Sequence, residues 1–220
     1  MIWMYALISM AWAIEIASVD RPSVGTSTYT LEKGGLQLES GLQIDGSQNG
    51  SVYSIPTMLR IGINDQVELR PYTSILSYSQ TDALLLQSSG IQGKAKLYSP
   101  IDHNIAFSIL ASSDMNAGSG IFLFDIWKDN WSMWVNAGHV LTYDTRTGSS
   151  IALAGVGYTF PQNHGLFIET SSTMEETATV TIEGGYTKTF QKIQVDVYAL
   201  KDVHTSENWQ LAMGIGWRFR

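Results

Sequence analysis

The side chains that most often carry acid–base catalysis in enzymes, the histidines, occur four times in this chain of 220 residues: His103, His139, His164 and His204. A hydrolase of the serine type needs a serine within hydrogen-bond reach of one of them. His139 falls inside an alternating segment, but its neighbour on the same face, Leu141, is not a serine. The other three fall in turns or polar loops. The sequence therefore predicts no catalytic residue.

The sequence also contains no motif that is typical of a metal or cofactor site. The chain has no cysteine, which excludes disulfides, thiol catalysis and zinc–thiolate centres. No nucleophile-elbow, H-E-x-x-H, P-loop or EF-hand spacing occurs, and Asp45 and Asn49 lack the further carboxylates that calcium prefers. The net charge is −7 without a basic cluster, which excludes nucleic acid as a partner. We predict no metal and no cofactor.

The charged residues follow a different pattern, that of long two-faced strands. Charged residues are only 15% of the chain, against roughly 25% in an average soluble domain. From Gly35 onward, apolar and polar residues alternate with period two, and short turns interrupt the pattern. The predicted strands cover approximately residues 35–46, 51–63, 66–79, 89–99, 104–113, 119–128, 130–144, 149–160, 164–173, 177–190, 192–202 and 207–219.

The two faces of these strands differ in kind. Successive residues of a strand point to opposite sides of the sheet, so Leu36, Leu38 and Leu42 share one face while Gln37 and Glu39 share the other. The polar faces together hold five acids and five bases at mid-strand. The side chains that we expect to face the lumen of a closed barrel are Glu39, Arg60, Glu68, Arg70, Tyr72, Lys94, Lys96, Glu169, Glu183, Asp196 and Arg218.

Strand length, strand number and aromatic placement favour a membrane barrel over a secreted soluble barrel or sandwich, which is the alternative fold. Transmembrane strands need roughly 9–11 residues, whereas globular strands average about 5–6. We expect an all-β, transmembrane antiparallel up-and-down barrel of about 12 strands. Segment 119–128 has apolar residues on both faces, so its lipid face stays unassigned. Aromatic side chains expected at the membrane interface are Trp127, Trp131, Tyr143, Phe160, Trp217 and Phe219.

The chain divides into three parts around one barrel domain. Residues 1–17 are predicted to be a signal peptide, because an uncharged apolar run ends in the small-x-small sequence Ala11-Trp12-Ala13, with cleavage near residues 13–17. Residues 18–34 lack alternation and form a periplasmic segment that either hangs free or folds inward as a plug. Residues 35–220 form the barrel.

Several stretches resemble a family of outer-membrane transport proteins, the "MetA-pathway of phenol degradation" family. Asp20-Arg21-Pro22 and the first strand from Leu36 to Glu39 are similar to the family's start. The segment PTMLRIGINDQVELR resembles its most characteristic hairpin, with Pro56, Leu59, Arg60, Gly62, Glu68, Leu69 and Arg70. The resemblance implies a Gram-negative outer-membrane barrel with a transport role.

The expected function is passive uptake of a small solute, aromatic or apolar if the family label is informative. The expected partners are the lipid bilayer, the barrel-assembly machinery and the solute, with the barrel a monomer. One alternative is a structural or adhesive barrel with a closed lumen, and another is an outer-membrane lipase or acyltransferase. The inward charges have two interpretations: ion pairs that hold strand register, or groups that line a solute path.

Overall fold

The computed structural model describes residues 25–47, 50–78, 84–100, 104–175, 178–205 and 207–219. The predicted signal peptide (residues 1–17), residues 18–24 and His103 lie outside the described residues. Among the described residues, no helix has the length and apolar character needed to cross a membrane.

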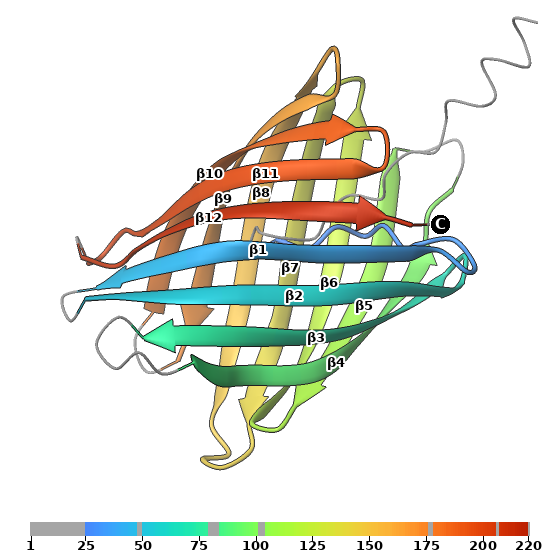
Figure 1. Cartoon of the computed structure of the whole chain (residues 1–220). Coiled ribbons are helices and arrows are strands. Elements are labelled where there is room, and N and C mark those ends of the chain that lie inside the picture. The colour runs from blue at the N-terminus through green and yellow to red at the C-terminus, as the bar shows by residue number, and fades with distance from the viewer. Residues whose placement is uncertain are drawn as a thin grey trace, which may run out of the picture.

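Twelve strands of the described chain form one closed antiparallel barrel in up-and-down order, with β1 paired to β12 (Figure 1). This confirms the predicted all-β fold class. The strands are β1 Leu36–Ser47, β2 Gly50–Asn64, β3 Val67–Tyr78, β4 Leu84–Tyr98, β5 Ile105–Asp114, β6 Ala117–Lys128, β7 Trp131–Thr142, β8 Gly148–Phe160, β9 His164–Met174, β10 Ala178–Phe190, β11 Ile193–Asp202 and β12 Trp209–Arg218.

The largest difference from the predicted boundaries is at β4, which begins at Leu84 rather than at residue 89. Leu84, Leu85 and Leu86 are consecutive apolar residues, so the start of this strand has no alternation that a period-two search could detect. The other strand ends fall within a few residues of their predicted positions, as expected where alternation is regular.

Two of the short connections are two-residue hairpin turns with left-handed backbone. Asp129 has a φ of 54° between β6 and β7, and Gln191 has a φ of 51° between β10 and β11. Primed turns of this kind match the twist of the strands that they join. At the end of the barrel where β1 begins and β12 ends, named the tight rim, four of the five connections have two or three residues, whereas the connections at the opposite rim have two to six.

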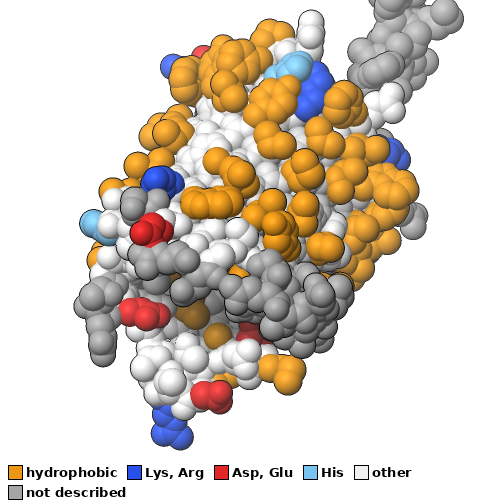
Figure 2. Space-filling view, turned by 60° about the vertical axis from the view of Figure 1, so that its left-hand side comes forward, with side chains coloured by type: hydrophobic (Ala, Val, Ile, Leu, Met, Phe, Trp, Pro, Cys, Tyr) orange, Lys and Arg blue, Asp and Glu red, His pale blue; other side chains and the backbone are white. Residues whose placement is uncertain are grey.

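The outer wall of the barrel is apolar and lacks a protein cover. Met213, Ile168 and Phe122 are 56%, 54% and 70% exposed, although each lies within a strand. Figure 2 shows hydrophobic side chains spread across much of one side of this wall, with few charged groups among them. Only hydrocarbon makes such a surface favourable, because water would penalise every exposed apolar side chain. The wall is therefore that of a transmembrane barrel.

The face of β6, which the sequence left unassigned, is resolved by the barrel. Phe122 and Ile126 are exposed on the outer wall, whereas Leu123 is 1% exposed on the inner side. Asp125 shares the inward face with Leu123 and bonds to the chain inside the lumen. The strand carries apolar residues on both faces because part of the lumen is itself apolar.

A charge on the outer wall should destabilise the barrel more than loss of the apolar side chain alone. Ile168→Arg places a guanidinium in the hydrocarbon layer, and we expect it to lower the free energy of unfolding by about 2–4 kcal/mol relative to the matched variant Ile168→Ala. Urea unfolding in lipid bilayers, followed by heat-modifiable gel mobility, measures the difference. Equal stability of the two variants would contradict the membrane placement of this wall.

Candidate functional site: a polar lumen with an internal chain segment

Arg60 is the centre of a buried ion-pair cluster inside the barrel. Its Nε lies 2.7 Å from Glu68 Oε1 and its Nη2 lies 2.9 Å from Glu68 Oε2, so the guanidinium holds this carboxylate with two hydrogen bonds. Its Nη1 lies 3.1 Å from Glu39 Oε1. All three side chains are fully buried. Such a pair is stable only if its remaining hydrogen-bonding capacity is also satisfied.

Neighbouring strands supply the rest of the cluster. Arg70, two residues after Glu68 on the inward face of β3, also donates from its Nε to Glu68 Oε1. Lys94 on β4 is in register with Glu68 and is fully buried. On β1, Gln37 Nε2 donates to Glu39 Oε1 over 2.8 Å. Period-two alternation on four adjacent strands therefore brings these groups together.

Residues 25–34 form an internal segment that precedes β1: residues 25–31 run inside the barrel, and the exposed residues 32–34 lie at its rim beside Asp65 (Figure 1). The backbone N–H groups of this internal segment donate to carboxylates of the wall. Gly25 N lies 3.0 Å from Glu169 Oε1 and Leu31 N lies 2.7 Å from Glu68 Oε2. Thr28 N lies 2.8 Å from Asp125 Oδ2, and its Oγ1 donates to the same oxygen over 2.9 Å. Charge-assisted bonds of this kind are roughly twice as strong as neutral ones.

The carbonyl groups of the internal segment accept hydrogen bonds from cationic and neutral donors. Lys94 Nζ lies 2.6 Å from the Ser27 carbonyl oxygen and 3.0 Å from that of Tyr29. Ser108 Oγ lies 2.7 Å from the Thr28 carbonyl oxygen. The backbone of the internal segment thus satisfies charged groups that face inward from the wall, and the wall satisfies backbone groups that are cut off from bulk water.

Two glycines permit this close approach. A Cβ atom at Gly62 of β2 would overlap the carbonyl oxygen of Glu32, and one at Gly25 would lie 2.6 Å from Glu169 Oε2. Glu32 in turn forms an ion pair with Arg218 near the end of β12. The absence of side chains at Gly25 and Gly62 is therefore a requirement of the internal segment's path rather than of the strands.

The balance of charge differs across the lumen, although Glu39 of β1 and Glu68 of β3 pair with the cations on their own side. Arg60, Arg70 and Lys94 project from β2, β3 and β4, whereas the buried carboxylates Glu169, Glu183 and Asp196 project from β9, β10 and β11. In the closed strand order, β3 and β9 are diametrically opposite. The internal segment directs an N–H group to Glu169 and carbonyl groups to Lys94. It therefore extends from the acidic side of the lumen, at β9, to the cationic side, at β4.

Part of the inner wall is apolar, which the sequence did not predict. Leu110 of β5, Leu123 of β6 and Leu153 of β8 face inward and are at most 7% exposed. They lie between the cationic strands and the acidic strands in the ring. The sequence contained one sign of this apolar inner surface. Segment 119–128 has apolar residues on both faces, which indicates a strand with apolar surroundings on both sides.

The structure places most of the predicted lumen-facing residues in the buried interior: Glu39, Arg60, Glu68, Arg70, Lys94, Glu169, Glu183, Asp196 and Arg218. Lys96 and Tyr72 are partly exposed, and Tyr72 donates from its hydroxyl to Asp114 Oδ2 over 3.1 Å. Sequence reasoning missed Asp125 and Ser108, which both bond to the internal segment. No rule of spacing relates Asp125 to Thr28, because the contact is made across the lumen.

The predicted interfacial aromatics lie near strand ends and are exposed. Trp217 and Phe219 pack together at the end of β12 with ring centroids 4.4 Å apart. Trp127 is the exception in orientation, because it follows the alternation of the inward Leu123 and Asp125 at the tight rim. Trp127 shares with the other five aromatics a position near a strand end, but it does not share their outward orientation.

A serine does lie beside His139, but on the next strand. Ser150 of β8 is paired with His139 of β7, and Ser150 Oγ lies 3.5 Å from His139 Nδ1 on the outer wall. This corrects the expectation that His139 has no serine neighbour, which was based on one strand only. Within the described ranges, no carboxylate forms a hydrogen bond with His139. In the same ranges, no group of three or more His, Cys, Asp or Glu side chains could hold a metal ion.

Comparison with known proteins bears on the fold. No protein-family model matches the chain, and no curated protein matches it in sequence. An outer-membrane channel from Pseudomonas putida F1 has a similar structure, with a TM-score of 0.67, 12% identity, and coverage of 90% of this chain and 100% of that one. The KdgM porin (TM-score 0.62, 10% identity, 84% and 99% covered) and the NanC porin (0.62, 7%, 83% and 98%) are also similar. The structural neighbours are thus outer-membrane channel and porin barrels.

Removing Arg60 should destabilise the barrel. Arg60→Ala leaves Glu68 and Glu39 without their main counter-ion in a buried site, and we expect the free energy of unfolding to fall by about 3 kcal/mol. Lys96→Ala, on the same inner wall but partly exposed, should cost less than about 0.5 kcal/mol. Urea titration of both variants in the same lipid tests this, and an unchanged midpoint for Arg60→Ala would count against a stabilising pair.

Proposed function

We propose that this chain is a Gram-negative outer-membrane channel through which a small solute diffuses into the periplasm, with residues 25–34 as an internal plug. The observation that carries the proposal is the way the lumen is filled. The buried charges of the wall bond to backbone groups of a segment that belongs to no strand. Those bonds can be exchanged for bonds to water or solute without breaking any pair of strands.

The proposal includes the route by which the barrel reaches its membrane. Residues 1–17 would direct export as a signal peptide, and the barrel-assembly machinery would insert residues 35–220 as a monomer. The support is the apolar start of the sequence, the apolar outer wall, and the similarity of the fold to outer-membrane channels and porins. The start of β1, the end of β12 and the tight rim would then lie on the periplasmic side.

The inner wall favours a small aromatic acid as the solute. Cations on β2–β4 offer partners for a carboxylate, and the neighbouring apolar strip of Leu110, Leu123 and Leu153 offers a surface for a ring. A solute with one charged end and one apolar end uses both surfaces, whereas a sugar uses only the first. The resemblance to the phenol-degradation family supports the same class of solute.

Loss of the plug should raise the conductance of the channel. A variant lacking residues 25–34 removes the backbone groups that fill the lumen, so we expect larger single-channel steps in planar bilayers than for the full chain. Lys94→Ala, which removes the donor to Ser27 and Tyr29, should give more frequent openings. Lys201→Ala on the outer wall is the control and should behave as the unaltered protein.

The same recordings separate the channel from a structural or adhesive barrel. Benzoate, a small aromatic acid, should reduce the current through the plug-deleted variant, and the reduction should weaken when Arg70 is replaced by Ala. Silence of both the full chain and the deletion variant, with heat-modifiable mobility confirming a folded barrel, would contradict the channel and favour a closed structural barrel.

Among the residues that the structure describes, the contact between Ser150 and His139 is the observation that favours an enzyme. Its 3.5 Å separation is longer than the roughly 2.6–3.2 Å of a working nucleophile and base, and His139 has no orienting carboxylate among the described residues. We therefore expect no release of fatty acid from phospholipid vesicles, with or without calcium, and no difference between the unaltered protein and Ser150→Ala. Fatty-acid release that Ser150→Ala abolishes would overturn this expectation.

A further inference from the structure

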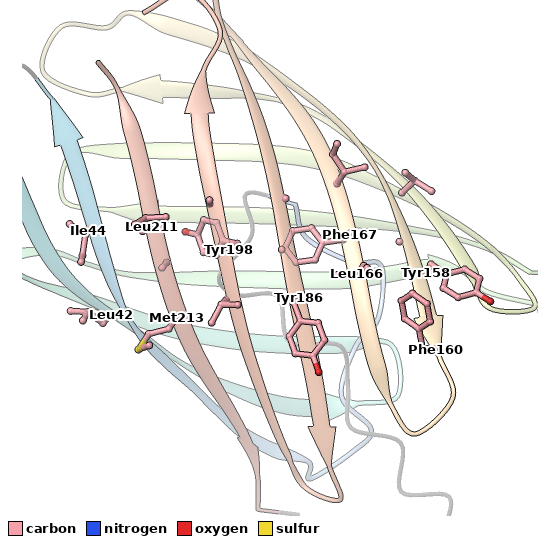
Figure 3. Close-up of a pocket in the computed structure, with 18 of the residues that line it drawn as sticks. Leu42, Ile44, Tyr158, Phe160, Leu166, Phe167, Tyr186, Tyr198, Leu211 and Met213 are labelled. Carbon is pink, nitrogen blue, oxygen red and sulfur yellow. The ribbon is translucent and has the colours of Figure 1, made fainter. Parts of the chain in front are cut away.

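The outer wall over β8–β12, with Trp131 of β7 and Leu42 and Ile44 of β1 at its edges, contains an apolar groove of about 980 Å³. Its sides are outward side chains of neighbouring strands, among them Leu166, Leu211 and Met213 (Figure 3). Its floor is Gly184 of β10, where an added Cβ atom would meet nothing closer than the Phe167 carbonyl oxygen at 3.7 Å. A missing side chain at the middle of the wall thus creates the depression.

The groove is closed toward the lumen. Phe167 and Tyr198 also contribute to its lining, but both follow the inward face of their strands. The ring of Phe167 occupies the space where a side chain at Gly185 would lie, and Tyr198 is buried and donates to Gln210 Oε1 over 2.6 Å. The groove is therefore a blind depression that opens to lipid, not a passage through the wall.

Polar groups gather at the end of the groove near the tight rim. Tyr186, which lines the groove, bonds to Nδ1 of His164. Lys188 Nζ lies 2.7 Å from His164 Nε2 and 2.6 Å from the Gln162 carbonyl oxygen. His164, Tyr186 and Lys188, named here the rim cluster, all follow the outward face of β9 and β10. The hydroxyl of Tyr186 is directed toward the carboxyl end of β10 (Figure 3).

The rim cluster has hydrogen-bond donors that its own internal contacts do not use. If His164 is neutral and its Nε2 accepts from the Lys188 ammonium, Nδ1 carries the ring proton and donates it to the Tyr186 oxygen. The hydroxyl proton of Tyr186 is then available for another acceptor. Lys188 has three protons and uses two in these contacts. Two donors from one small cluster can therefore bind the same external anion.

The charge of Lys188 is uncompensated on the protein side. Among the residues that the structure describes, no carboxylate lies within ion-pair distance of Lys188. An aromatic ring is beside it instead, because Phe190 lies under its ammonium at 5.5 Å. Tyr158 and Phe160 pack together on β8 with centroids 4.7 Å apart, and Phe160 is in register with His164 of the rim cluster. Aromatic girdles lie at the depth of the lipid headgroups. The anions available to a cation at that depth are lipid phosphates.

We propose that this groove and the rim cluster together bind one anionic phospholipid of the periplasmic leaflet. The phosphate accepts hydrogen bonds from Lys188 and Tyr186, and an acyl chain lies along the groove over Gly184. The inference rests on the membrane orientation in the proposed function but not on the passage of a solute. It assigns a role to a cation on the lipid-facing wall that the channel itself does not use.

Native mass spectrometry of the full chain in detergent, titrated with phosphatidylglycerol, tests the proposal. We expect one tightly retained lipid per barrel, with affinity about tenfold weaker in Lys188→Ala, since a charge-assisted bond to phosphate is lost. Lys201→Ala removes another outward lysine at the opposite rim and is the matched control, which should leave retention unchanged. Gly184→Leu fills the groove without altering charge and should weaken retention as well.

The probes distinguish the parts of the site. Inorganic phosphate should not compete at concentrations where phosphatidylglycerol saturates, because the groove contributes to binding. Equal retention by Lys188→Ala, Lys201→Ala and the unaltered chain would overturn the proposal, as would unchanged retention by Gly184→Leu. Heat-modifiable mobility and channel recordings on the same preparations establish whether each barrel is folded and conducts. A conducting barrel without selective lipid retention therefore refutes the lipid site alone.

Discussion

The structure depends on one constraint: charged side chains that face into a closed twelve-strand barrel must find partners there. Arg60, Glu68 and Glu39 are fully buried, so each unmade hydrogen bond would carry the full cost of removing that group from water. Ion pairs between adjacent strands satisfy part of this requirement. The backbone of residues 25–34 satisfies more, with N–H groups on the carboxylates and carbonyl groups on Lys94. The internal segment and the charged wall therefore require each other.

The same barrel solves the opposite problem on its outside. Apolar side chains such as Ile168 and Met213 remain exposed because lipid takes the place of a protein core. Lys188 and His164 are among the polar groups of this wall, and they lie at a rim and beside a groove. The lumen and the lipid-facing groove are separated by Phe167 and Tyr198. Solute passage and lipid binding are thus independent properties of two faces of one sheet.

Much of the barrel could be predicted because period-two alternation is a local property. It gave the fold class, the approximate strands and the inward side of residues such as Glu68 and Glu183. It failed at β4, where Leu84 to Leu86 do not alternate, and at β6, where both faces are apolar. It could not find the contacts of Thr28 with Asp125 or of His139 with Ser150. These depend on strand register or on a path across the lumen, which no local spacing encodes.

The most direct test of the central claim is hydrogen–deuterium exchange of the amides of residues 25–34, measured for the full chain in lipid nanodiscs. Thr28 and Leu31 donate to the buried carboxylates of Asp125 and Glu68, so their amides should exchange far more slowly than those of a solvated tail. Asp125→Asn and Glu68→Gln should each accelerate exchange of the partner amide. Rapid exchange throughout residues 25–34 in the unaltered protein would contradict an internal segment held by the charges of the wall.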